Sequence, residues 1–228
     1  MSLYNRTRTI DQEYAFADDN ALVNFVKTTY KFFGASLLFA AIGAFIGSQN
    51  YGIVMQYFGA IIILEIIAYF GLLFSKNKPV LNVAMLFIYT TLSGVTLVPL
   101  LGFVISKSGL SAVWQALAMT TIIFGIMSIF ALKTKNDLTK LSKILFYSLI
   151  VVIAFILINI FLGSPLLQVL IAGGSAILFS IFVAFHTQNI VRGAYDNPVE
   201  AAIGIYLAFL NIFISILQLI GLFGNRND

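Results

Sequence analysis

Long apolar runs separated by short polar turns dominate the chain after residue 31. Phe32 to Leu64 contains no Asp, Glu, Lys or Arg, and Ile144 to Val191 contains none of these and a single histidine. A bilayer core about 30 Å thick takes about 20 apolar residues to cross as a helix, so each run is too long for one crossing. Strands of a membrane barrel would alternate in polarity, which these runs do not do. The pattern therefore predicts several membrane-spanning helices.

Polar turns divide the chain into seven predicted spans. Gly47 to Gly52 interrupts the first run, Gly163 to Pro165 interrupts the second, and Pro99 should kink the third span. The predicted helices cover residues 31–48, 52–74, 80–105, 111–132, 143–162, 166–190 and 199–222. They make one transmembrane domain at 31–222, with a polar cytoplasmic tail at 1–30 and a short tail at 223–228. No apolar stretch with a small-residue cleavage site opens the chain, so we expect no removable signal peptide.

Composition and charge support this class of protein and predict its orientation. Hydrophobic residues make up 60% of the 228 residues and charged ones 10%, against about a quarter charged in soluble domains. The amino-terminal tail and the second, fourth and sixth loops hold 11 of the 13 Lys and Arg residues. The positive-inside rule then predicts a cytoplasmic amino terminus and an external carboxyl terminus. It also explains the net charge of +4 without a nucleic-acid partner.

Several kinds of chemistry are excluded by the residues at hand. The chain has no cysteine, which excludes disulfides, thiol nucleophiles and cysteine-ligated metal clusters. One histidine and scattered carboxylates do not make a zinc ligand set. Ser175 and His186 would lie about 16 Å apart along one helix, too far for a catalytic dyad, and 199–222 has no lysine for a retinal Schiff base. We expect no enzyme, no cofactor and no resident metal.

Glu65 is the acidic residue furthest inside an apolar span. An intramembrane carboxylate costs several kcal/mol unless it is protonated, paired or facing water. It is a candidate proton- or cation-binding group on an ion pathway, with Tyr69 one turn along the same face as a supporting hydrogen-bond donor. The alternative is a neutral, hydrogen-bonded structural acid.

His186 is the only histidine and lies near the cytoplasmic end of the sixth predicted span, with Asn189 on the same helix face. Imidazole titrates near neutral pH, so this residue is a candidate pH-sensing element. The alternative is an interfacial histidine that only packs. Gly43 and Gly47, like the Ser and Thr cluster of the third span, are more typical of helix packing than of substrate binding.

Four stretches of the chain form recognisable motifs. They are Tyr89-Thr90 with Ser93 to Pro99 (SGVTLVP), Asn136-Asp137-Leu138, Phe185 to Gly193 (FHTQNIVRG) and Ile205 to Phe213 (IYLAFLNIF). Together they resemble the transmembrane Bax inhibitor family, in particular its bacterial YccA-like branch. The likeness covers nearly the whole chain from about residue 20 and is strongest over the last two spans. It implies a bundle of six helices around a central carboxyl-terminal helix, in the inner membrane of a bacterium.

The resemblance also implies a pH-sensitive leak for calcium or protons, because the better-understood bacterial relatives use an acidic pair for it. This chain has His186 and Ala208 at the two acidic positions, so it cannot form the shared-proton carboxylate pair. Glu65 matches the family's acid in the second span, and Lys76 stands near its basic position there. Asn211 belongs to the seventh-span motif and is a further supporting candidate.

The YccA-like branch implies a second class of function. Its known association is with a membrane-anchored, ATP-dependent quality-control protease. On that hypothesis the protein is a binding partner or slow substrate of the protease, is held through the polar tail before Lys27, and needs no pore. Both hypotheses remain open at the level of the sequence, with the lipid bilayer as the common partner.

Overall fold

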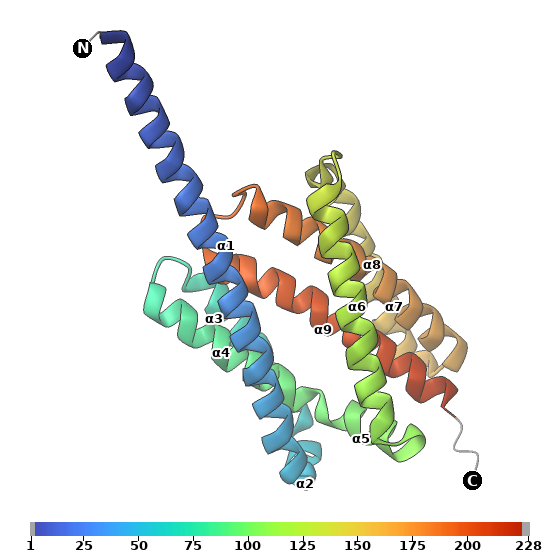
Figure 1. The fold of residues 1–228 in the computed structure, drawn as a ribbon. Coiled ribbons are helices and arrows are strands. Elements are labelled where there is room, and N and C mark those ends of the chain that lie inside the picture. The colour runs from blue at the N-terminus through green and yellow to red at the C-terminus, as the bar shows by residue number, and fades with distance from the viewer. Residues whose placement is uncertain (1–2, 225–228) are drawn as a thin grey trace.

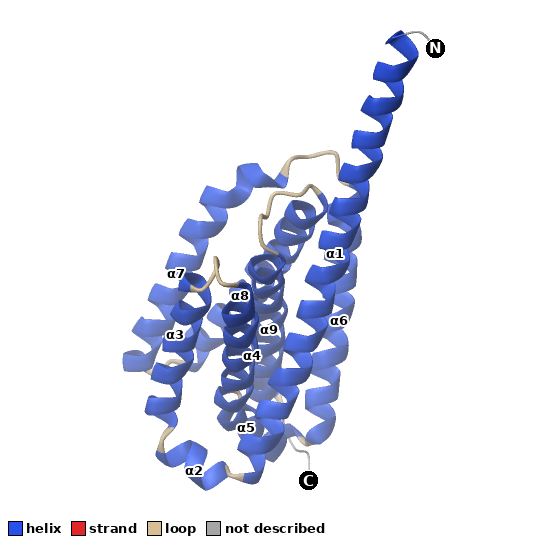
Figure 2. Cartoon of the chain, turned by 90° about the vertical axis from the view of Figure 1, so that its left-hand side faces the viewer, coloured by secondary structure: helices blue, strands red, loops and turns tan. Residues whose placement is uncertain are grey.

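The computed structural model describes the backbone of residues 3–224 and side chains from Asn20 onward, and over that range the chain is helical with no strand (Figures 1 and 2). The helices are α1 (Leu3–Gln49), α2 (Tyr51–Gln56), α3 (Phe58–Phe74), α4 (Pro79–Thr96), α5 (Val98–Ser108), α6 (Leu110–Lys133), the 3-10 helix η1 (Leu138–Leu141), α7 (Ser142–Leu162), α8 (Pro165–Val191) and α9 (Pro198–Phe223). The predicted all-α class is confirmed. The tail beyond Gly224 lies outside the described residues.

Six stretches of helix in this part of the chain are long and apolar enough to cross a membrane. They are Asn20–Gln49, Pro79–Ser108, Leu110–Lys133, Leu138–Leu162, Pro165–Val191 and Pro198–Phe223. The second predicted span, 52–74, is instead two helices, the short α2 and the 17-residue α3, which meet at Tyr57. At 1.5 Å per residue α3 is about 26 Å long, close to the lower limit for a span.

Prolines and an aspartate set the helix boundaries where the sequence placed them. Pro79, Pro165 and Pro198 each stand in the first turn of a helix, where the missing N–H costs nothing. Pro99 lies in the first turn of α5, and the predicted kink is the break at Leu97 between α4 and α5. Asp137 caps the 3-10 helix η1, because its carboxylate accepts from the Thr139 backbone N–H at 3.1 Å.

Helix α9 supplies the core of the bundle. Over its most apolar 18 residues 56% are buried, against 11–33% for the other five long helices. It packs against α1, α4, α5, α6 and α8, and its buried side chains join two apolar clusters, one around Ile205 and Tyr206 and one around Ile212 and Leu217. Helix α7 is the opposite case: it packs on α8 and η1 at the edge of the bundle.

Glycines allow α1 and α4 to approach closely. A Cβ atom at Gly43 would collide with the Thr91 carbonyl, and one at Gly94 would collide with the carbonyl of Ala40. A Cβ atom at Gly47 would lie 2.8 Å from the side chain of Val98. Backbone contact of this kind is the packing that small residues permit between membrane helices. The prediction that Gly43 and Gly47 are packing residues is confirmed.

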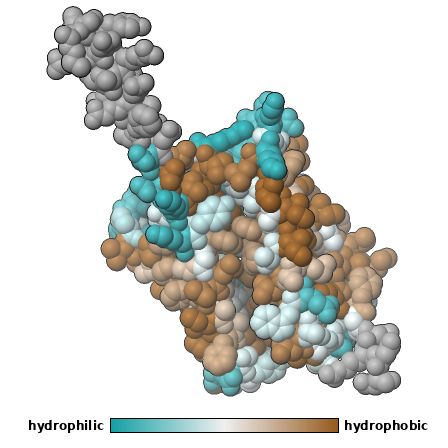
Figure 3. Space-filling model, viewed as in Figure 1, coloured by the Kyte–Doolittle hydropathy of each residue, from teal (hydrophilic) through white to brown (hydrophobic). Residues whose placement is uncertain are grey.

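The outer surface is apolar around the middle of the molecule and polar at two ends (Figure 3). Phe161 is 91% exposed and Leu166 71%, and a face of such residues is stable in lipid rather than in water. We call the end with loops 75–78, 134–141 and 192–197 the basic end, since it holds Lys76, Lys78, Lys135, Lys140 and Arg192. Helix α1 extends beyond the bundle on that side (Figure 1).

Candidate functional site

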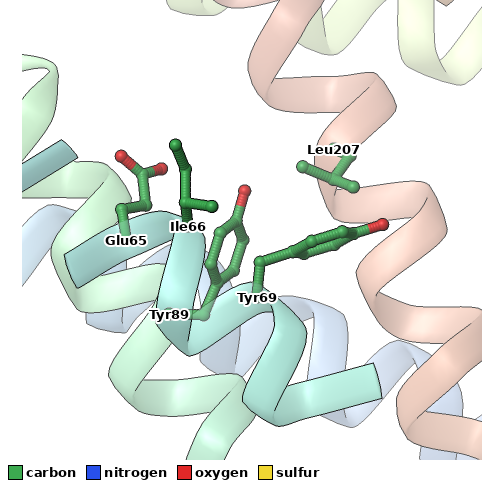
Figure 4. Close-up of a pocket in the computed structure, with 5 residues that line it drawn as sticks. All are labelled: Glu65, Ile66, Tyr69, Tyr89 and Leu207. Carbon is green, nitrogen blue, oxygen red and sulfur yellow. The ribbon is translucent and has the colours of Figure 1, made fainter. Parts of the chain in front are cut away.

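Glu65, which belongs to the predicted second span, lines a cavity between α3, α4 and α9. The cavity has a volume of about 280 Å³ and is lined by Glu65, Ile66 and Tyr69 of α3, Tyr89 of α4 and Leu207 of α9 (Figure 4). The Glu65 side chain is half-buried, and Thr96 of α4 is within hydrogen-bonding reach of its carboxyl group. We call this the Glu65 cavity. It combines a single acid with hydroxyl groups on a mostly apolar wall.

Three tyrosines extend the polar surface of the Glu65 cavity into the core. The rings of Tyr69 and Tyr89 lie 5.5 Å apart, and Tyr89 meets Tyr206 edge-on at 6.4 Å. Tyr206 is fully buried, and its hydroxyl group pairs with Ser93 Oγ at 2.5 Å. The cluster therefore runs from the half-buried acid on α3 to the buried hydroxyl pair formed by Ser93 of α4 and Tyr206 of α9.

This arrangement suits the binding of a proton or a cation. Tyrosine and threonine hydroxyls can donate to a carboxylate or accept from its protonated form, which lowers the cost of keeping an acid within the membrane. A water molecule occupies about 30 Å³ in the liquid, so the Glu65 cavity is large enough for several. The cavity therefore offers room for water beside the carboxyl group.

His186 of α8 lies in a second, tighter polar site between α8 and α9. Its Nδ1 atom pairs with the Tyr195 hydroxyl at 2.5 Å, and its ring stacks on Phe182 at 5.7 Å. A Cβ atom at Gly204 of α9 would come within 2.8 Å of the imidazole, so the histidine fits there because position 204 has no side chain. Aromatic rings and backbone fill the space around the imidazole.

Tyr195 is the hydrogen-bond partner of His186, and the spacing of His186 and Asn189 in the sequence did not predict it. It lies in the loop between α8 and α9, and Asn189 is buried within hydrogen-bonding reach of its hydroxyl. Burial raises the pKa of Tyr195 to about 12, and the nearby Glu200 carboxylate adds to the rise in pKa. Tyr195 therefore keeps its hydroxyl proton near neutral pH, and the tautomer of the imidazole decides whether this hydroxyl group donates to Nδ1 or accepts from it.

The two other supporting candidates lie apart from both sites. Lys76 forms an ion pair with Glu200 at 2.6 Å at the basic end, where Glu200 raises the pKa of the lysine. Asn197 ties the same region together by donating to the Lys76 carbonyl at 3.2 Å and to Asn82 Oδ1 at 3.0 Å. Asn211 donates to the Leu207 carbonyl of its own helix at 2.8 Å and reaches neither Glu65 nor His186.

Helix α9 borders both sites. Gly204 of α9 faces His186, whereas Leu207 of α9 lines the Glu65 cavity together with residues of α3 and α4. Within residues 20–224 no hydrogen bond or ion pair joins Glu65 to His186. No three His, Asp or Glu side chains of the described residues converge on one point either. The acid and the imidazole therefore act as separate groups.

Tyr89, Ser93 and Tyr206 are the site residues that the chemical analysis of the sequence did not single out. Their only signal in the sequence is that each falls in a motif shared with the family, while nothing in their spacing indicates that they meet. Ser93 and Tyr206 are 113 residues apart in the chain. Glu65, by contrast, can be recognised from the sequence because it is an ionisable residue within an apolar span.

Comparison with known proteins places the chain among bacterial membrane proteins. The profile of the family described as "Inhibitor of apoptosis-promoting Bax1" matches residues 22–226. A protein of Helicobacter pylori strain J99, named an uncharacterized protein, is 60% identical over the full length of both chains. One from Campylobacter jejuni is 39% identical over 99% of this chain and all of its own. An uncharacterized membrane protein of Vibrio cholerae is 34% identical over 97% of each.

Proposed function

The chain belongs to the Bax inhibitor family of membrane proteins, and on that basis we propose that it passes or senses protons or calcium through its helix bundle. The observation that carries the proposal is the Glu65 cavity. A single carboxyl group stands there within a membrane span, beside hydroxyl groups and enough volume for water. An intramembrane acid in such a setting is typical of an ion or proton pathway.

The proposal includes a seven-span topology. We take α2 and α3 together as the second span, which gives seven spans, of which α9 is the most buried. The basic end then faces the cytoplasm of the cell and the chain lies in the inner membrane. In this orientation Glu65 lies within the bilayer, and Lys76 with its partner Glu200 stands where α3 leaves it.

Protons suit the site better than calcium. Calcium takes six to eight oxygen ligands, usually from several carboxylates, whereas the Glu65 cavity offers one carboxylate and a few hydroxyls. Position 208, acidic in the relatives that leak calcium, is here an alanine buried in an apolar cluster on α9. A single carboxyl group with hydroxyl neighbours can still take up and release a proton.

We assign His186 the role of pH-sensitive element. Protonation would put a charge beside Gly204 of α9 and would make the imidazole a donor only in its hydrogen bond with Tyr195. The Tyr195 loop leads directly into α9. A change at His186 would therefore act on the helix that also borders the Glu65 cavity.

Flux into liposomes tests the proposal. The purified protein is reconstituted with a pH-sensitive or calcium-sensitive dye inside, and the parent is compared with Glu65→Gln and His186→Ala. We expect Glu65→Gln to reduce flux to the level of empty liposomes, and His186→Ala to retain flux but lose its dependence on pH. If the parent itself does not exceed empty liposomes, the pathway does not exist.

A second candidate function rests on the extension of α1. The helix continues beyond the bundle at the basic end (Figure 1), which presents a long segment to a partner on that side of the membrane. We propose as the alternative that this segment binds a membrane-anchored, ATP-dependent protease. Deleting residues 1–26 should then abolish co-purification with the protease, while equal recovery of the full and shortened chains would refute that contact.

A further inference from the structure

A groove runs between α7 and α8 on the outer face of the bundle. It consists of two adjoining hollows of about 560 and 310 Å³ that share Val151, Val152 and Gly174. Gly174 has open space where a side chain would stand, so α8 does not fill the gap that α7 leaves. The walls are apolar apart from Tyr147 and Ser148 near one end.

The α7 wall of the groove is about as long as one leaflet is thick. From Ile144 to Phe155 it covers twelve residues, whose ends lie about 17 Å apart at 1.5 Å per residue, against about 30 Å for the whole hydrocarbon core. This wall starts near the end of α7 that leaves η1 at the basic end, while the α8 wall continues to Leu167 near the start of α8. The part of the groove along α7 therefore has the length of a lipid acyl chain in the leaflet at the basic end.

Two lysines stand at the open end of the groove. Lys143, Tyr147, Val151 and Phe155 follow one another every four residues, which places them on one stripe of α7, and the last three line the groove. Lys143 thus lies on the same stripe, one turn before Tyr147. Lys140 precedes Lys143 in the chain and belongs to η1. Both lysines are exposed.

Neither lysine is neutralised within the described chain. The ion pairs among residues 20–224 are Lys76 with Glu200 and Arg192 with Asp137. Asp137, the acid nearest in the sequence, is thus already paired with Arg192. Two positive charges above an apolar groove are complementary to a phosphate group whose acyl chain lies below it.

We propose that the groove between α7 and α8 binds an anionic phospholipid of the leaflet at the basic end. Lys140 and Lys143 hold its headgroup, Tyr147 lies at the level of the glycerol backbone, and one acyl chain fills the space beside Gly174. A second copy of the chain is a poorer occupant. Packed side by side in the same orientation, its own Lys140 and Lys143 would lie at the same level and repel this pair.

Quenching of a single tryptophan by brominated lipids tests the proposal. The native Trp114 is first replaced, as Trp114→Phe, and a reporter is introduced by Ile177→Trp on the wall of the groove. A matched reporter, Ile122→Trp, lies on the lipid-facing side of α6, where the native side chain is similarly exposed at 60% against 68% for Ile177. The protein is placed in vesicles of phosphatidylcholine and phosphatidylglycerol, with one or the other lipid brominated.

At the groove reporter we expect phosphatidylglycerol to bind in preference to phosphatidylcholine, by about fivefold for each lysine that contacts the headgroup. The Ile122→Trp reporter should show a ratio near one. Lys140→Gln with Lys143→Gln should bring the groove ratio to that same value, whereas Lys143→Arg should keep it. Gly174→Leu should weaken quenching by both lipids, because the added side chain occupies the acyl-chain space.

Two outcomes would overturn the proposal. Equal ratios at the two reporters would mean that any lipid fills the groove and that the lysines select nothing. Weak quenching by both lipids in Ile177→Trp, but not in Ile122→Trp, would mean that another protein surface covers the groove. Should Ile177→Trp not fold, Tyr147→Trp provides a reporter on the opposite wall and the same comparison.

Discussion

The Glu65 cavity and the His186 site both border α9 and hold a buried polar group in different ways. Glu65 borders about 280 Å³ of space with hydroxyl groups on its walls. His186 is held by a tyrosine hydroxyl, stacked on Phe182 and pressed against Gly204. One site has room for something to enter, and the other is filled by the protein itself. A group in an open cavity can exchange with water, whereas a packed group acts through the structure around it.

Closing the cavity should have the largest effect on function. Leu207 is the residue through which α9 reaches the Glu65 cavity, and Leu207→Trp would fill much of the space beside the carboxyl group. We expect proton or calcium flux in liposomes to fall at least tenfold. Leu207→Met, which keeps a similar volume, is the matched control and should retain flux. Equal flux through both variants would show that ions do not use this cavity.

Overfilling the His186 site should chiefly affect stability. In Gly204→Val a branched side chain would press on the imidazole, which lies 2.8 Å from the Cβ position. Overpacking of this kind costs about 1–3 kcal/mol, which thermal unfolding in detergent would report as a lower midpoint. Gly34→Ala is the control, because nothing lies within 4 Å of its Cβ position and alanine favours the helix. A midpoint unchanged in Gly204→Val would mean that α8 and α9 are not packed as closely as described.

Much of the architecture follows from the sequence because lipid imposes simple rules on it. Runs free of charge had to be helices, and Pro99 had to interrupt the third span. The break at Tyr57 had no such signal, since neither proline nor glycine marks it. The predicted tail at 1–30 is helical from Leu3, and its polar composition could not reveal this.

The candidate sites were predictable only as single residues. Glu65 and His186 stand out because ionisable groups are rare in these spans. Their partners Tyr206, Ser93 and Tyr195 do not, because hydroxyl groups are tolerated in membrane helices and their meeting depends on how α4, α8 and α9 are rotated against one another. That rotation is set by packing around α9, which involves residues far apart in the chain.

Removing the buried hydroxyl pair should have a moderate effect. Ser93→Ala would leave the fully buried hydroxyl of Tyr206 without its partner on α4. Hydrogen bonds between membrane helices contribute about 0.6 kcal/mol on average and up to about 1.7 kcal/mol, so the unfolding midpoint should fall less than in Gly204→Val. Ser106→Ala is the control, because Ser106 is exposed and bonds only to its own helix. A larger loss in Ser106→Ala than in Ser93→Ala would contradict the assignment.

The smallest effect should come from the exposed ion pair between Asp137 and Arg192. The direction of the Asp137 pKa shift separates this pair from the His186 site. Hydrogen bonds from Thr139, with a smaller contribution from Arg192, hold the pKa of Asp137 below its usual value. A lowered pKa contributes stability above the unfolded value of about 3.9, and this contribution is lost as pH falls through the folded pKa. Asp137→Asn should therefore flatten the dependence of the melting temperature on pH below about 4 and leave it unchanged from pH 5 to 8.

The pKa of Lys76 shifts in the opposite direction to that of Asp137, and it too leaves stability near neutral pH unchanged. Glu200 raises the pKa of Lys76, so its contribution is complete below the unfolded value of about 10.4 and is lost only as pH rises through the folded pKa. Neither Asp137 nor Lys76 therefore contributes a pH response between pH 5 and 8. A pH response of the parent in that range that survives in Asp137→Asn and in Lys76→Gln but disappears in His186→Ala must originate at the His186 site. A response that persists in His186→Ala would assign the sensor to the Glu65 cavity.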